Sequence, residues 1–163
     1  MSNILRKFVF VPVLAMGLAT AALTTAVFAD ENEVNITSTG LALRGYDPVS
    51  YFTDGAPMPG AFDITADYEG ATYRFTSAEH AEMFKADPAK YVPEFGGYCA
   101  FGAAFGKKFD GDPTVWKIVD GKLYLNLAKP VAEKWLADQP YFISEASSKW
   151  TEIKDKPAAE LNN

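Results

Sequence analysis

The chain has 163 residues, of which 48% are hydrophobic and 14% aromatic, and a formal net charge of -6. This length and composition can bury the core of one domain. The acidic balance, with Lys and Arg scattered along the chain, argues against nucleic-acid binding, which needs clustered basic residues. With a single cysteine, Cys99, and a single histidine, His80, the chain can form no internal disulfide and has few ligands for a soft metal.

Residues 1–29 are predicted to be a signal peptide. The basic pair Arg6-Lys7 precedes an uncharged apolar run at 8–27, and Val27-Phe28-Ala29 offers the small residues that signal peptidase accepts. A retained anchor is the alternative, because the run approaches the ~20 residues that span a bilayer. The processing site favours cleavage before Asp30, which predicts a periplasmic or secreted product with no stable membrane anchor.

The first part of the remaining chain is predicted to be irregular and then β-rich. Residues 30–44 are polar and are interpreted as a flexible N-terminal segment. Residues 45–52 combine turn residues with aromatic and β-branched ones, which indicates a turn into a first strand. Residues 62–75 alternate apolar and polar side chains around Glu69-Gly70, a pattern that predicts a β-hairpin.

A helix is predicted to begin after Ser77, an acceptable N-cap, and to end or kink at Asp87-Pro88. His80 and Phe84 are four residues apart, so they should share the helix face that looks toward the hairpin. The glycine pair Gly96-Gly97, which allows a tight backbone, precedes the cysteine.

The strongest hairpin pattern spans residues 115–126, with Asp120-Gly121 as its turn. Helices are predicted at 129–138 and 141–154, separated by Pro140, and residues 155–163 are predicted to be a loose tail. The predicted fold class is therefore α+β: a small single domain at 45–154, in which two β-hairpins pack against several short helices.

Several motifs in residues 45–150 resemble those of the YHS-domain family, in particular its small, exported, single-domain branch. They are Gly45-Tyr46-Asp47-Pro48-Val49-Ser50-Tyr51-Phe52, Tyr73-x-Phe75-x-Ser77-x-x-His80-x-x-x-Phe84, Pro88-x-x-Tyr91, Gly96-Gly97-Tyr98-Cys99-Ala100 and Gly121-Lys122-Leu123-Tyr124-Leu125-Asn126. The resemblance covers most of the chain after residue 29 and implies a YHS-like fold.

The chain differs from the metal-binding branch of that family. YHS-like domains attached to heavy-metal transporters resemble Asp-Pro-Val-Cys at the first element and Phe-Cys-x-x-x-Cys at the junction of hairpin and helix. Ser50, Thr76 and His80 stand at the corresponding positions here, so two thiolates are replaced by hydroxyls and one by an imidazole. The resemblance therefore does not transfer that metal site to this chain.

Two hypotheses for Cys99 and His80 involve no catalysis. In the first, both are structural: a small buried hydrophobe and a hydrogen-bonded core histidine. In the second, they bind a soft metal such as copper, with Met83 or Met58 as a further ligand, because Cu(I) accepts sulfur donors and low coordination. Structural zinc would need carboxylates or a second subunit to complete its four ligands.

In a third hypothesis the chain is a thiol-dependent enzyme, with His80 as the general base for a Cys99 nucleophile. Asp47 would orient the imidazole, and the backbone N–H groups of Gly96-Gly97 would outline an oxyanion site near the sulfur. This hypothesis is the least favoured, because glycines beside a cysteine are equally explained by tight packing.

The function expected from the sequence is that of an exported, YHS-like binding module, with a copper-class metal as its most concrete ligand. The alternative to a metal ion is a protein partner. A pure interaction module predicts an exposed aromatic patch, formed by Tyr46, Tyr51 and Tyr98.

Overall fold

The computed structural model describes residues 33–163, so the predicted signal peptide lies outside the described residues. Its helices are α1 (Ser50–Thr53), α2 (Ala78–Ala86), α3 (Pro88–Tyr91), α4 (Ala100–Ala103), α5 (Lys129–Ala137), α6 (Gln139–Ile153) and α7 (Ala158–Leu161), with 3₁₀ turns η1 (Leu43–Gly45) and η2 (Glu94–Gly97). The strands are β1 (Ala61–Tyr68), β2 (Ala71–Phe75), β3 (Asp112–Val119) and β4 (Lys122–Asn126).

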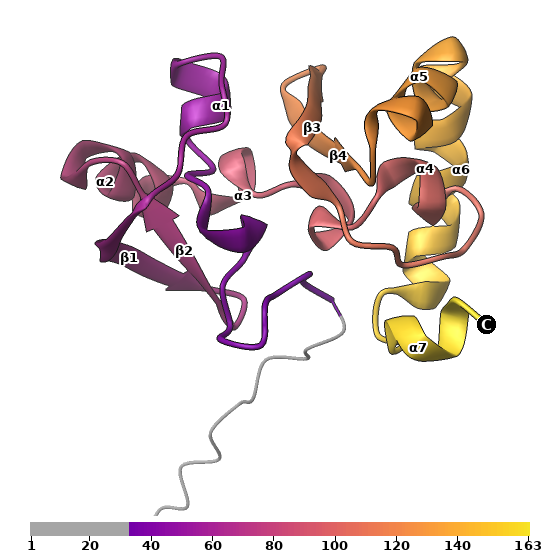
Figure 1. Cartoon of the computed structure of the whole chain (residues 1–163), viewed down its shortest axis with the longest axis horizontal. Helices are drawn as coiled ribbons and strands as arrows, with labels where there is room; N and C mark the ends of the chain where they lie inside the picture. The colour runs from indigo at the N-terminus through magenta and orange to yellow at the C-terminus, as the bar shows by residue number, and fades with distance from the viewer. Residues whose placement is uncertain (1–32) are drawn as a thin grey trace, which may run out of the picture.

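The described chain is a small α+β domain with two separate two-stranded antiparallel sheets, as the sequence predicts. Figure 1 shows the β1–β2 hairpin with α1 and α2 at one end of the long axis, and β3, β4 and the helices α4 to α6 toward the other end. No helix within residues 33–163 is long and apolar enough to cross a membrane.

Both hairpins form where the alternation and the turn residues predict them. The turn residues Glu69 and Gly70 have φ of 45° and 72°, and Asp120 and Gly121 have φ of 50° and 76°. Positive φ at both positions is the geometry that two-residue hairpin turns need, and glycine adopts it without strain. The predicted helices at 77–87, 129–138 and 141–154 are confirmed as α2, α5 and α6, with small differences at their ends.

The prediction of a strand at residues 45–52 is wrong, because the segment contains the helical turn α1. Asp47 explains the difference: its Oδ1 accepts a hydrogen bond from Val49 N at 2.8 Å, and Ser50 Oγ donates to Asp47 O at 2.8 Å. These local bonds start a helical turn in a run whose aromatic and β-branched residues otherwise favour a strand.

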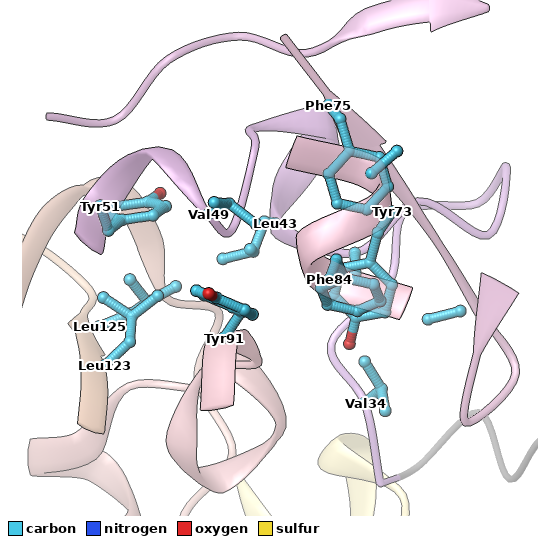
Figure 2. Close-up of a cluster of buried hydrophobic side chains, with 13 residues drawn as sticks. Val34, Leu43, Val49, Tyr51, Tyr73, Phe75, Phe84, Tyr91, Leu123 and Leu125 are labelled. Carbon is cyan, nitrogen blue, oxygen red and sulfur yellow. The ribbon is translucent and has the colours of Figure 1, made fainter. Parts of the chain in front are cut away.

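Two apolar clusters lie side by side and share strand β4. In Figure 2, Tyr73, Phe75 and Phe84 gather on one side of the first cluster, and Leu123 and Leu125 of β4 lie on the other. The second cluster is built mainly from the helices and from Tyr124, the β4 residue between those leucines. Its buried members are Phe95, Ala100, Ala103, Ala104, Tyr124, Trp135 and Ala146. Because side chains alternate along β4, Leu123 and Leu125 pack in the first cluster and Tyr124 packs in the second.

The two segments expected to be loose are both held against the domain. In the first, Val34 is buried and Asn35 N donates to Gly96 O at 2.8 Å. In the second, residues 155–163, the side chain of Asn162 binds both the N–H and the C=O of Lys108. The ammonium of Lys108, itself buried, donates to the carbonyl oxygens of Lys154 and Lys156. Polar composition predicted mobility, but these hydrogen bonds, backbone to backbone at Asn35 and side chain to backbone at Lys108 and Asn162, oppose it.

Candidate functional site

Asp47 is the centre of a buried polar network that joins three elements. Its carboxylate is fully buried, and its Oδ2 accepts hydrogen bonds from Thr76 N and Thr76 Oγ1, each at 2.8 Å. The same oxygen accepts from His80 Nδ1 at 2.7 Å. A carboxylate without water needs such partners, since an unpaired buried charge is strongly destabilising. The network therefore fixes the first turn against the start of α2.

His80 is oriented by this network with one ring nitrogen left toward the surface. Because a carboxylate only accepts hydrogen bonds, Nδ1 is the protonated ring nitrogen and donates to Asp47. Nε2 is then the nitrogen available for other contacts. Nε2 lies 3.4 Å from Thr53 Oγ1 and 4.0 Å from Asp54 Oδ2. The His80 side chain is 14% exposed. The arrangement suits a structural link, and Nε2 remains a base or single metal ligand at the edge of the domain.

The hydroxyls of Ser50 and Thr76 are engaged in structural hydrogen bonds. Ser50 Oγ donates to Asp47 O and accepts from Met58 N at 3.1 Å. Thr76 Oγ1 donates to Asp47 Oδ2 and lies 3.1 Å from His80 Nδ1. Together with the ring, these side chains surround Asp47 and complete its shell of donors.

Cys99 is the N-cap of α4, and its thiol is enclosed. The sulfur accepts from Gly102 N at 3.4 Å and lies 3.6 Å from the acceptor Asn126 Oδ1. That oxygen also accepts from Phe101 N at 3.2 Å, and both Cys99 and Asn126 are 1% exposed. These contacts give the thiol the role that a serine hydroxyl has at other helix starts. They do not present it as a nucleophile.

The structure does not bring Cys99 and His80 together. Their side chains share no hydrogen-bond partner, and Figure 1 shows α2 and α4 toward opposite ends of the molecule. Of the three catalytic candidates, His80 and Asp47 are in contact and Cys99 is separate. Within residues 33–163, no group of three or more His, Cys, Asp and Glu side chains is arranged to hold a metal ion.

The remaining predicted ligands and donors also have other surroundings. Met83 is half-buried and packs against the first apolar cluster, and Met58 is exposed. The backbone N–H that reaches the sulfur is that of Gly102, in place of the expected Gly96-Gly97 pair. Gly96 instead lies so close to Glu33 O that a Cβ would stand 1.9 Å from that oxygen. The pair thus serves tight packing.

The aromatic patch expected for an interaction module is not formed by the predicted residues. Tyr51 and Tyr98 are buried, and the Tyr51 hydroxyl donates to Pro113 O at 2.9 Å. Tyr46 is only partly exposed and packs against the first cluster. These rings supply core volume, because aromatic side chains contribute the largest apolar areas.

An apolar cavity of about 360 Å³ lies beside Cys99. Its lining residues come from the α4 region, the loop after it and the start of α5: Cys99, Phe101, Gly102, Phe105, Lys107, Phe109, Leu127 and Val131. Phe105, Phe109 and Leu127 are 59%, 39% and 43% exposed. Large apolar side chains gathered at a cavity mouth are typical of a binding site.

Sequence reasoning missed this cavity, although one signal for it is present. Phe101, Phe105 and Phe109 are spaced by four, which would place them on one helix face. The helix ends at Ala103, however, so Phe101 reaches the cavity from α4, whereas Phe105 and Phe109 reach it from the loop that follows. Leu127 and Val131 reach it from a distant part of the chain, which no local pattern indicates.

Comparisons of the chain with protein-family models, with curated proteins and with solved structures found no match.

Proposed function

We propose that the chain is an exported, YHS-like binding module and that its cavity beside Cys99 takes a small, uncharged, apolar molecule. The observation that carries this proposal is the cavity itself, with a volume of about 360 Å³ and a wall of aromatic and aliphatic side chains. Small-molecule sites in proteins span about 300 to 1,000 Å³ and are lined mainly by such side chains.

The charge around the cavity favours a neutral ligand. Within residues 33–163, Lys107 is the only charged residue that lines it, and the Lys107 ammonium donates to Leu161 O at 2.5 Å and to Asn163 O at 3.1 Å. Only the aliphatic stem of this lysine is then left to line the cavity. A ligand would gain its affinity from burial of apolar area, at roughly 25 cal/mol per Å².

Cys99 has a supporting role in this proposal. Its thiol caps α4 and binds the side chain of Asn126, so it holds Phe101 and the following loop in place. The geometry does not favour copper binding or thiol catalysis through the Cys99 and His80 pair, since either would need both side chains at one ligand.

The test is the binding of N-phenyl-1-naphthylamine, a neutral apolar fluorophore, to the protein. We expect saturable binding with enhanced emission, and at least about tenfold weaker binding in Val131→Trp, whose indole fills the cavity. Leu136→Trp is the matched control, because Leu136 lies on the same helix, is 50% exposed and does not line the cavity.

Two results would contradict the proposal. One is the absence of saturable binding to the unmodified protein. The other is an equal loss of affinity in Val131→Trp and Leu136→Trp, which would indicate a general surface effect. Thermal unfolding of both variants checks that each is folded.

A further inference from the structure

A second cavity, of about 290 Å³, lies between the turn of the first hairpin and α6. It differs from the cavity beside Cys99 because three acidic residues, Glu33, Glu69 and Glu94, are among those that line it. Apolar side chains complete the wall, namely those of Val34, Val92, Pro93, Phe95 and Trp150. A ligand here would meet negative charge on one side and apolar surface on the other.

One of the three carboxylates has no compensating charge within the described chain. Glu33 pairs with Lys154 at 3.2 Å, and Glu94 pairs with Lys122 at 3.2 Å. Glu69 forms no ion pair with any residue between 33 and 163 and is exposed at the hairpin turn. The cavity therefore keeps a net negative charge, which attracts a cation.

Tyr73 places a hydroxyl without a partner at the same cavity. The residue is 2% exposed and lines the cavity, yet its hydroxyl forms no hydrogen bond to the part of the chain that the structure describes. Figure 2 shows the Tyr73 oxygen pointing toward Val34, another residue of the wall. Burial raises the pKa of Tyr73, and the charge of Glu69 acts in the same direction, so the hydroxyl stays neutral at physiological pH.

We propose that this cavity binds a small organic ammonium ion. Its N–H groups would donate to the Glu69 carboxylate and to Tyr73 Oη, while its apolar body packs against Phe95 and Trp150. The Tyr73 hydroxyl forms no hydrogen bond within residues 33–163, so its oxygen can accept one from an N–H group of a ligand in the cavity. The volume is at the lower limit for ligand sites, which selects a small amine.

The recognition rests on hydrogen bonds more than on a cation over an aromatic face. Lys108 Nζ already lies 5.2 Å from the centre of the Trp150 ring, so the ring has one cation as a neighbour. A protonated primary amine, which has N–H donors, should therefore bind better than a quaternary ammonium, which has none.

Isothermal calorimetry of the protein with 2-phenylethylammonium tests the proposal. We expect saturable binding, and at least about tenfold weaker binding of two analogues. One analogue is 2-phenylethanol, which has the same body without the charge. The other is the N,N,N-trimethyl derivative, which keeps the charge without an N–H donor. Equal affinity for the ammonium and the alcohol, or no binding of the ammonium, would overturn the proposal.

Variants locate the site. Tyr73→Phe removes only the hydroxyl, and Glu69→Gln removes only the charge, and each should weaken binding of 2-phenylethylammonium about tenfold. Glu82→Gln is the matched control, since Glu82 pairs with Lys85 on α2, outside the cavity. Val131→Trp should also leave this affinity unchanged, which separates the inference from the proposed apolar site. Unchanged affinity in both Tyr73→Phe and Glu69→Gln would overturn the assignment.

Discussion

The surroundings of His80 are polar, whereas those of Cys99 are largely apolar. His80 belongs to a polar network in which a fully buried carboxylate accepts hydrogen bonds from Val49 just before α1, from Thr76 just after β2 and from His80 in α2. Cys99 has two polar contacts of its own, but the space beside it is apolar and empty enough to hold a ligand. The two residues that the sequence suggested as one site thus lie in two regions with different surroundings.

This difference supports our proposal that stability and binding reside in different regions of the domain. Both carboxylate oxygens of Asp47 are taken up by protein donors, which join the first turn to the start of α2. The region beside Cys99 keeps large apolar side chains exposed, which costs solubility and is retained in proteins mainly for binding. We therefore assign stability to the first region and binding to the second.

The largest effect should follow from Asp47→Asn. An amide at this position would put an NH₂ group against donors, so buried N–H groups would lose their acceptor. We expect the free energy of unfolding to fall by about 3–5 kcal/mol in urea titrations. Asp54→Asn, whose side chain is half exposed, should change it by less than about 0.5 kcal/mol. A loss below about 1 kcal/mol in Asp47→Asn would remove the stabilising role assigned to the network.

A smaller effect is expected from Cys99→Ser, because a hydroxyl can keep both the cap of α4 and the bond to Asn126. The loss of stability should be about 1 kcal/mol.

Copper(I) titration of the reduced protein against a competing chelator should give the same weak binding in the unmodified protein, Cys99→Ser and His80→Ala. High affinity that disappears in both variants would instead support a shared copper site and break the comparison.

A third effect is confined to alkaline pH. Burial, with a contribution from the charges of Glu94 and Asp120, raises the pKa of Tyr124 to about 12. The folded state then holds a proton that the unfolded state releases near pH 10, so stability is retained below pH 10 and declines as pH rises toward 12. Tyr124→Phe should show a shallower decline in unfolding free energy than the unmodified protein. Tyr141→Phe, at a position 53% exposed, should follow the unmodified curve.

Local patterns predicted the hairpins and helices, because their signals are contained in a few neighbouring residues. Asp120-Gly121 between alternating runs is sufficient for a hairpin. The prediction of a strand at residues 45–52 fails because strand propensity does not include the hydrogen bonds that Asp47 makes within its own turn.

The sites were less predictable, because their contacts join distant residues. Asp47 and His80 are 33 positions apart, and the candidate orienting role of Asp47 was correct only as a contact with the imidazole. The separation of Cys99 from His80 depends on how the two hairpins pack, which no spacing in the sequence encodes. The lack of a hydrogen-bond partner for the Tyr73 hydroxyl within residues 33–163 likewise follows from the tertiary structure and from no local pattern.

The buried ammonium of Lys108 has a consequence for the order in which the chain can fold. Its carbonyl acceptors belong to Lys154 and Lys156, which are 46 and 48 positions further along. A chain that is synthesised from its N-terminus would expose Lys108 before those acceptors are made. The packing around the Lys108 ammonium can then be completed only after residues 154–156 are available.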